Sequence, residues 1–482
     1  MENLEVTIQL PNLKLNIPED SLNFHYLERI IFDLSRKIGQ ELLEELLQII
    51  DDRLMAERER GSLSNQGKRL RYITTLLGDI TFYKRLYQDR GGKYRYLLDE
   101  KLSLEKNQRV SKLYEKIEGL LAFVSGSYRK AEGLIQEFYG DSPSFESVRQ
   151  QVIRQGEKIL KEEQERIDQE LIKALRQTDD ELTKEADGGI VYLEVDGTNI
   201  HLQHEEKKRA ELKLGIISKG KESRYKTGKG EAKKLQDKFT YAGITSGDEF
   251  MSNLAILGEK RFQLSQAELV LIGGDGASWV KEGAKNYFPG SIYQLCKFHL
   301  ERKIKQTLPY HKEIQKSIRG LLKEGEIDKA LKELHQERNL RPGHKKDLEG
   351  LMHYIYSNQE GINAVDRLRE QGFPVEDLGA IEGNLDKTLA NRFKKRGMRW
   401  SIPGALSLAK VGQMIVNQEW GSWWPIEADQ IELKLDLEKV FSLDFDKGSN
   451  DKYDHTYSLP VLSGPHQDRP WVKSLKRLVS IN

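Results

Sequence analysis

Two short runs of β-forming residues constrain the fold of this chain more than any other feature. Residues 190–195 and 269–272 are mostly apolar and lie next to glycine pairs, which predicts two buried strands of a mixed α/β sheet. Each run leads into an aspartate followed by glycine, at Asp196 and Asp275. Side chains at the carboxyl ends of such strands converge on ligands, so we expect both carboxylates at one site, with the glycines leaving room for a ligand. An Asp-Gly pair also forms turns, and that interpretation stays open.

Composition limits the class of protein. The 482 residues are enough for several domains of about 100–200 residues each. The 77 Lys+Arg and 76 Asp+Glu nearly cancel, which excludes a uniformly basic surface but permits a basic face. Cys296 is the single cysteine, so intrachain disulfides and multi-cysteine zinc modules are excluded. No apolar run approaches a membrane span and no signal peptide is evident, so we expect a cytoplasmic protein.

The spacing of apolar residues along the chain changes within the first hundred residues. Residues 27–54 have helical spacing, and this amphipathic helix either packs on its own domain or pairs subunits. Residues 71–98 alternate around a Gly-Gly turn at 89–92, which predicts a small antiparallel sheet whose last strand reaches Leu98.

Two predicted helices at 127–136 and 145–152 flank a short turn that contains glycine. Gly140 can end the first helix, and Ser142 or Ser144 can cap the second. The pair is compatible with a DNA-binding helix-turn-helix over 127–156, with Arg149 and Arg154 on the second helix, although an ordinary helical hairpin has the same pattern. The charged run 157–187 predicts a solvated connecting helix.

A third carboxylate, Glu382, precedes a strongly basic segment. Residues 387–399 hold six Lys/Arg and no acidic residue, which suits phosphate contacts, and Trp400 can stack on bases. The expected DNA-contacting residues here are Lys387, Arg392, Lys394, Lys395, Arg396, Arg399 and Trp400. Glu382 is either a surface ion-pair partner or a metal ligand. Residues 205–238, with twelve Lys/Arg against six Asp/Glu, fit a solvated surface as well as a DNA contact.

Four blocks in chain order carry a family resemblance: 194–203 around Asp196, 274–279 around Asp275, 293–300 with Cys-x-x-His, and 382–401. Together they resemble the bacterial ISLre-type insertion-sequence transposases, which are relatives of the Mutator-like DDE group. The shorter blocks 77–82 and 96–100 resemble the N-terminal part of that family.

The resemblance implies an α/β, RNase H-like catalytic core with an all-helical insertion. It places the catalytic, metal-binding triad on Asp196, Asp275 and Glu382, with two Mg²⁺ or Mn²⁺ ions per active site. The Cys-x-x-His element falls on Cys296 and His299, and a lone cysteine does not favour zinc. We expect His299 to orient DNA or a ligand near the site, and an ordinary core or surface histidine remains the alternative.

The implied function is a DNA transposase that cuts the ends of an insertion sequence and joins the 3′-OH ends to target DNA. Its partners are then the terminal inverted repeats, target DNA and a second or further copy of the chain, in the cytoplasm at the bacterial nucleoid. Two alternatives remain: a non-catalytic DNA-binding protein, or an RNase H-like nuclease that cuts without joining.

The expected organisation follows from pattern and resemblance together. In chain order it comprises an N-terminal helical region that is a candidate for dimerisation (1–60), a small antiparallel β region (61–105), a helical region with the candidate helix-turn-helix (106–187), the first part of the core (188–300), the helical insertion (301–375), the last part of the core (376–412) and a C-terminal region of unassigned role (413–482).

Overall fold

The computed structural model describes residues 23–59, 61–140, 143–176, 189–227, 230–340, 342–394 and 397–424. Within these ranges, every helix is too short or too polar to cross a membrane.

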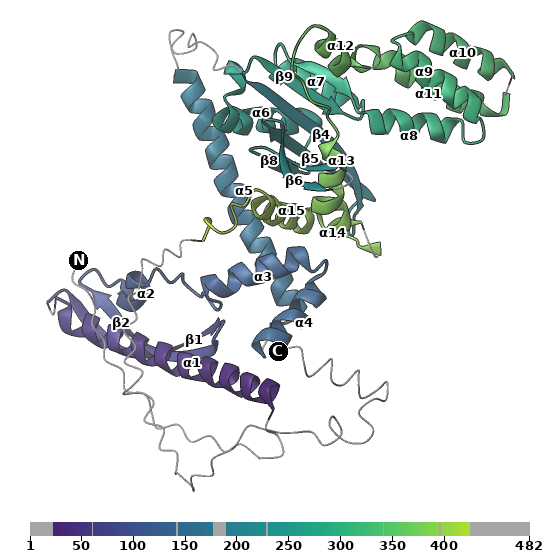
Figure 1. The fold of residues 1–482 in the computed structure, drawn as a ribbon. Helices are drawn as coiled ribbons and strands as arrows, with labels where there is room; N and C mark the ends of the chain where they lie inside the picture. Colours follow the sequence, from purple (N-terminus) through teal and green to yellow (C-terminus); the bar gives the residue numbers. More distant parts are fainter. Residues whose placement is uncertain are drawn as a thin grey trace, which may run out of the picture. The chain divides into compact units, whose positions relative to one another are not determined.

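The N-terminal module is a long helix packed on a small sheet (Figure 1). Helix α1 (Phe24–Glu57) confirms the helix predicted over 27–54, and strands β1 (Leu63–Thr75), β2 (Gly78–Asp89) and β3 (Tyr94–Arg95) confirm the antiparallel sheet. Leu47 of α1 packs with Ile73 and Phe82 of the sheet. The prediction for Leu98 was wrong, because it lies fully buried in helix α2 (Leu97–Lys101) beneath this core rather than in a strand.

Three helices connect this module to the central sheet. They are α3 (Lys112–Val124), α4 (Tyr128–Tyr139) and α5 (Phe145–Arg176). Both helices predicted at 127–136 and 145–152 are present. Gly140, at φ +79°, ends α4, and the hydroxyl of Ser144 accepts a hydrogen bond from the N–H of Ser147 at the start of α5.

Helix α5 corrects the expectation of a solvated connector after residue 156. It continues without a break to Arg176 and buries Ile159 and Ile167 in the cores on either side of the central sheet. Most of its charges occupy the faces that point to solvent, which is why its composition resembles that of a free helix, whereas Glu163 is buried. Residues 177–187 of the predicted connector lie outside the described residues.

The central sheet has the strand order β10-β9-β4-β5-β8. Its members are β4 (Ile190–His201), β5 (Arg209–Ser218), β8 (Phe239–Gly243), β9 (Leu269–Gly274) and β10 (Ile292–Leu295). Strands β4, β5 and β8 are antiparallel neighbours, whereas β9 runs parallel to β4 and β10 parallel to β9. The two strands predicted at 190–195 and 269–272 are therefore present in one mixed sheet. Strands β6 (Lys221–Thr227) and β7 (Gly230–Leu235) form a separate two-stranded ribbon.

Helices cover both faces of this sheet, and alternation along β4 decides which residues meet them. Val191, Leu193 and Val195 pack against α6 (Gly247–Phe262) and α7 (Ser278–Tyr287). Tyr192, Glu194 and Asp196 have the opposite parity, and Tyr192 packs with α12 (Ala364–Glu370) on the other face. On that face, α15 (Ile402–Val416) also packs on β5 and β8.

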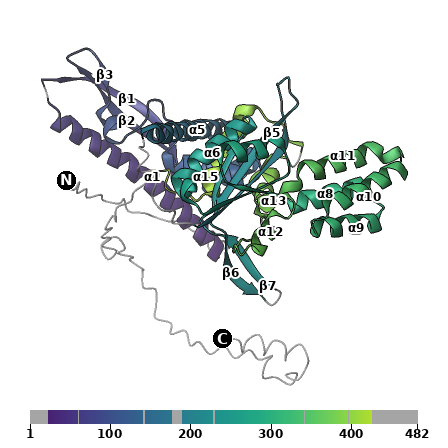
Figure 2. The same ribbon diagram turned by 90° about the horizontal axis from the view of Figure 1, so that it is seen from above.

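The chain between β10 and the last part of the sheet core is helical, as predicted for 301–375. Helices α8 (Lys297–Thr307), α9 (Lys312–Lys323), α10 (Ile327–Leu340) and α11 (Lys345–Ser357) form a bundle beside the sheet (Figures 1 and 2). Ile318, Leu334 and Leu351 fill its own core. The chain then returns through α13 (Ala380–Leu385), a π-helical turn and α14 (Asn391–Phe393) to α15.

The tryptophans after α15 pack against one another rather than extending into solvent. Trp420 and Trp424 are buried and their rings contact each other and Trp423. The indole N–H of Trp420 donates to the backbone carbonyl of Lys116 in α3. This cluster joins the end of the described chain to the three connecting helices.

Candidate active site

Strand register brings Asp196 and Asp275 to the same level of the sheet. Strands β4 and β9 are parallel neighbours whose last paired residues are Glu194 and Gly273. Each aspartate follows its paired residue by two positions, Asp196 within β4 and Asp275 directly after the end of β9. Neighbouring strands lie about 4.8 Å apart, so the two residues lie near each other at this edge, and the charge of Asp275 raises the pKa of Asp196.

A third carboxylate reaches this edge from α13. Glu382 lies in the first turn of α13, and the helix is fixed by Glu194, which is nine-tenths buried on β4. The Glu194 carboxylate accepts hydrogen bonds from the backbone N–H groups of Gly379, Ala380 and Ile381, at 2.8, 3.1 and 3.2 Å. These are orphan donors of a helix N-terminus, where a negative charge is favoured. The strand that carries Asp196 thus also holds the helix that carries Glu382.

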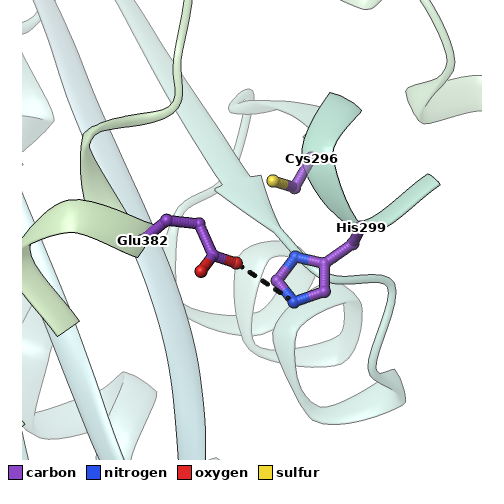
Figure 3. A group of neighbouring side chains, drawn as sticks. All are labelled: Cys296, His299 and Glu382. Atoms are coloured by element: carbon purple, nitrogen blue, oxygen red, sulfur yellow. Dashed lines mark ion pairs between the residues drawn. The ribbon is translucent and has the colours of Figure 1, made fainter. Parts of the chain in front are cut away.

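His299 connects the two acidic elements. Its Nε2 atom lies 3.2 Å from Oε1 of Glu382 and 3.9 Å from Oδ2 of Asp196. Figure 3 shows the imidazole facing the Glu382 carboxylate, with the Cys296 side chain close to both. Among the described residues, Cys296, His299 and Glu382 each offer a ligand atom within 4.8 Å of the others. Three such donors are one short of a closed zinc site, and burial raises the pKa of the Cys296 thiol, which disfavours the thiolate that zinc needs.

The charge state of Asp196 reflects this crowding. Burial raises its pKa to about 6, while a charged His299 and the N–H of Gly197 act in the opposite direction. The negative charges of Asp275 and Glu382 raise it further. Like charges held together without water disfavour one another unless a cation neutralises them. The burial and the neighbouring negative charges therefore favour the protonated form of Asp196.

The glycines after the two aspartates do not leave space for a ligand, contrary to the sequence-based expectation. A Cβ on Gly197 would lie 2.3 Å from the Glu211 carboxylate, and one on Gly276 would lie 2.9 Å from the ring of Tyr354. Gly276 also has φ +93°, which favours glycine. The hydroxyl of Tyr354 donates to the Asp275 carbonyl at 2.7 Å. Both glycines therefore serve close packing around the acidic residues.

Space is found on the other side of Glu382. A cavity of about 240 Å³ lies between β10, the start of α8 and the start of α13. Glu194, Cys296, Phe298 and Glu382 line it. Phe298 is half exposed, so an apolar ring borders the opening next to the acidic residues.

The predicted DNA-contacting residues divide into three groups. Lys394 and Arg399 are exposed, as is Arg154, whereas Arg149 is partly exposed and pairs with Glu146. Lys395, Arg396 and the Lys387 side chain lie outside the described residues.

Arg392 and Trp400 require a correction, because both are buried. The Arg392 guanidinium lies over the rings of Tyr128 and Trp400 and donates to the Ala122 carbonyl, and the Trp400 indole N–H donates to the Phe393 carbonyl at 3.0 Å. Trp400 also pairs with the end of β4 through its backbone. These side chains join α3, α4 and the sheet. The prediction that Arg392 and Trp400 contact DNA was therefore wrong.

Sequence reasoning missed Glu194 as a functional residue. The available signal was its position two residues before Asp196, which places both carboxylates on one face of a strand. Nothing in the sequence, however, indicates that the partners of Glu194 are backbone groups of residues 379–381, because that contact is made only in the folded chain.

Comparison with known proteins identifies the family of this chain. The profile described as "Uncharacterised protein family (UPF0236)" matches residues 17–424. The chain belongs to the UPF0236 family. A UPF0236 protein of Caldanaerobacter subterraneus subsp. tengcongensis is 25% identical over 454 residues, covering 89% of this chain and 87% of the relative, and its name carries eleven locus designations. A UPF0236 protein of Streptococcus gallolyticus, named as lying in the vanSb 3′ region, is 22% identical and covers 91% of this chain and 93% of the relative.

Proposed function

We propose that this UPF0236 protein is a DDE-type DNA transposase, which cuts the ends of an insertion sequence and joins the 3′-OH ends to target DNA. The observation that carries the proposal is that Asp275 and Glu382 lie near enough to Asp196 for their charges to raise its pKa, while His299 lies 3.9 Å from Asp196 and 3.2 Å from Glu382. The three carboxylates come from separate elements, and a buried carboxylate with two acidic neighbours is costly unless it has a role.

The topology supports an RNase H-like core. Three antiparallel strands are followed by two parallel ones in the order β10-β9-β4-β5-β8, with the first strand in the centre. The helical insertion between β10 and α13 separates the second aspartate from the glutamate along the chain, as the resemblance to ISLre-type transposases implies.

The residues present fit divalent cations. Three carboxylates are the donors that Mg²⁺ or Mn²⁺ prefers, and Asp196, Asp275 and Glu382 would hold the ions. When bound, such ions supply charge neutralisation and a more acidic water or 3′-hydroxyl. The chain itself contributes rigidity: Glu194 fixes the helix that carries Glu382, and His299 contacts Glu382 and approaches Asp196.

The relatives support a mobile element. One name with eleven locus designations in a single organism is what repeated insertion of the same gene produces. We extend this interpretation to the present chain, and we propose that it acts in the cytoplasm on nucleoid DNA.

We further propose a homodimer or larger assembly, because two ends must be joined in one event. Helix α1 exposes Ile31 and Phe32, which favours it as the pairing surface. Changing both to glutamate should reduce the assembly measured by light scattering without lowering the melting temperature, because neither side chain is buried in the protomer.

The deciding experiment incubates purified protein with labelled element ends, target plasmid and Mg²⁺. We expect cut ends and joined products, both lost in Asp196→Asn, Asp275→Asn and Glu382→Gln variants that still unfold in one cooperative transition and keep the wild-type circular dichroism spectrum. Full strand transfer by any of these variants would remove that residue from the triad. Cutting without joining would favour the nuclease, and DNA binding without metal-dependent cutting would favour the non-catalytic binding protein.

A further inference from the structure

The N-terminal module contains a groove whose walls are fixed by backbone pairing. Its volume is about 1220 Å³, and it lies along β1 and the segment 104–109 that follows α2. The N–H of Thr74 donates to the Arg109 carbonyl at 2.8 Å, and the N–H of Ser111 donates to the Thr74 carbonyl at 2.9 Å. These bonds attach the segment to the edge of the sheet. We refer to this feature as the β1 groove.

The β1 groove carries an excess of positive charge. Its lining includes six basic side chains and three acidic ones: Arg69, Arg71, Lys84, Arg95, Lys106, Arg109, Asp79, Asp99 and Glu100. Within the lining, Asp99 pairs with both Arg71 and Lys84, and Glu100 pairs with Arg95.

Three cations remain available to a ligand. Arg69, Lys106 and Arg109 are exposed and form no ion pair with the described residues. Because these charges are not neutralised by the protein, they are free to meet phosphates and release counterions.

Polar donors accompany these cations. Tyr72 and Tyr94 line the β1 groove and are 63% and 59% exposed. Asn107 also lines the groove and lies between Lys106 and Arg109 in the chain. Tyrosine, asparagine and basic side chains are the groups that contact phosphate oxygens in protein–DNA complexes. These groups lie on β1, on β3 and on the segment 104–109, so they form an extended track rather than a small-molecule pocket.

The basic surface continues past the segment 104–109. A second hollow of about 490 Å³ shares residues 106–109 with the β1 groove and reaches Arg154 and Lys158 of α5. Arg154 is one of the residues predicted to contact DNA. Lys158 is tied to Glu105, whose pKa the hydrogen bonds from Lys112 and Lys158 lower to about 2. The basic side chains here that form no ion pair with the described residues are therefore Lys106, Arg109 and Arg154.

We propose that the β1 groove binds the phosphate backbone of duplex DNA away from the acidic site, through Arg69, Lys106 and Arg109. The identity of that duplex as the end of an insertion sequence rests on the proposed function, whereas the binding itself does not. The inference also places the main non-catalytic DNA contact on the sheet and on the segment 104–109 rather than on a helix-turn-helix alone.

The test measures binding without catalysis. The full chain with Asp196→Asn is titrated, in EDTA, onto a fluorescent 30-base-pair duplex between 50 and 300 mM KCl. We expect Arg69→Ala/Lys106→Ala/Arg109→Ala in this background to weaken binding at least tenfold at 100 mM salt. The slope of log K against log salt should fall by about 2.7, since each lost phosphate contact contributes about 0.9.

A matched control removes three exposed lysines from the helical bundle, Lys316→Ala/Lys332→Ala/Lys346→Ala, and should leave the slope unchanged. Lys106→Gln/Arg109→Gln, which alters only the exposed segment, should lower the slope by about 1.8 and guards against misfolding of the triple variant. An unchanged slope in both groove variants, or a loss confined to single-stranded DNA, would overturn the inference. Failure of the proposed function is seen separately, as absence of metal-dependent cutting by a wild-type protein that still binds duplex.

Discussion

His299 and Glu382 face each other across the candidate site, with 3.2 Å between Nε2 of the histidine and Oε1 of the glutamate. The same Nε2 lies 3.9 Å from Asp196, so one imidazole approaches carboxylates from β4 and α13. The contact is made by the first turn of α8, at the entrance to the helical insertion. His299 thereby joins the insertion to the acidic site, as does Tyr354 of α11 through its hydrogen bond to the Asp275 carbonyl.

Replacing His299 should shift the pH profile of DNA cutting. A charged His299 lowers the pKa of Asp196, so His299→Gln should raise that pKa above its value of about 6. Asp196 must be ionised to bind a cation, so activity should fall more at pH 6.5 than at pH 8.5. The measurement is the initial cutting rate against pH. Phe298→Leu, at the exposed neighbour, should leave the profile in place, and an equal loss at all pH values would contradict this explanation.

Asp196→Asn should stabilise the metal-free protein at high pH. The folded-state pKa of Asp196 is raised from 3.8 to about 6, mainly by burial. A raised carboxyl pKa costs stability as the pH rises through the folded value, by up to about 3 kcal/mol for two pKa units. The variant should therefore melt at a higher temperature than wild type at pH 8 in EDTA, and the difference should shrink at pH 5. A pH-independent difference would indicate another cause.

Glu194→Gln should impair cutting more than binding. The amide would present N–H groups to backbone donors of residues 379–381, leaving helix α13 with unpaired donors. We expect a loss of about 2 kcal/mol in the free energy of unfolding and a fall in cutting rate, with duplex affinity in EDTA unchanged. Glu268→Gln, at an exposed position before β9, is the control and should alter neither. Wild-type cutting by the Glu194 variant would show that α13 is held by other contacts.

The buried pair of Lys410 and Glu163 should dominate the attachment of α15 to α5. Both side chains are at least nine-tenths buried, and Gln413 hydrogen-bonds to each of them. Lys410→Met leaves the Glu163 charge unpaired and should cost about 3–5 kcal/mol in urea unfolding. The double variant Lys410→Met/Glu163→Leu should recover much of that loss. If the double variant is less stable than the single one, the unpaired-charge explanation is wrong.

Local patterns predicted the elements themselves. Helical spacing over 27–54, the β-forming runs at 190–195 and 269–272, and the caps at Gly140 and Ser144 are short-range features, and each appears in the structure. The position of Asp196 and Asp275 at the ends of two β-forming runs is also readable from the chain. The site residues that depend only on their own strand were therefore within reach of sequence.

Only the tertiary structure decided what each polar or aromatic residue faces. Arg392 and Trp400 belong to a basic segment that resembles a DNA contact, yet they are buried against Tyr128, while α5 buries apolar residues within a run of charges. Glu194 gains its role from three N–H groups nearly two hundred residues away in the chain. Sequence determined the helical and strand periodicity because this depends on neighbouring residues. Burial and partnership depend on long-range packing, which no local pattern encodes.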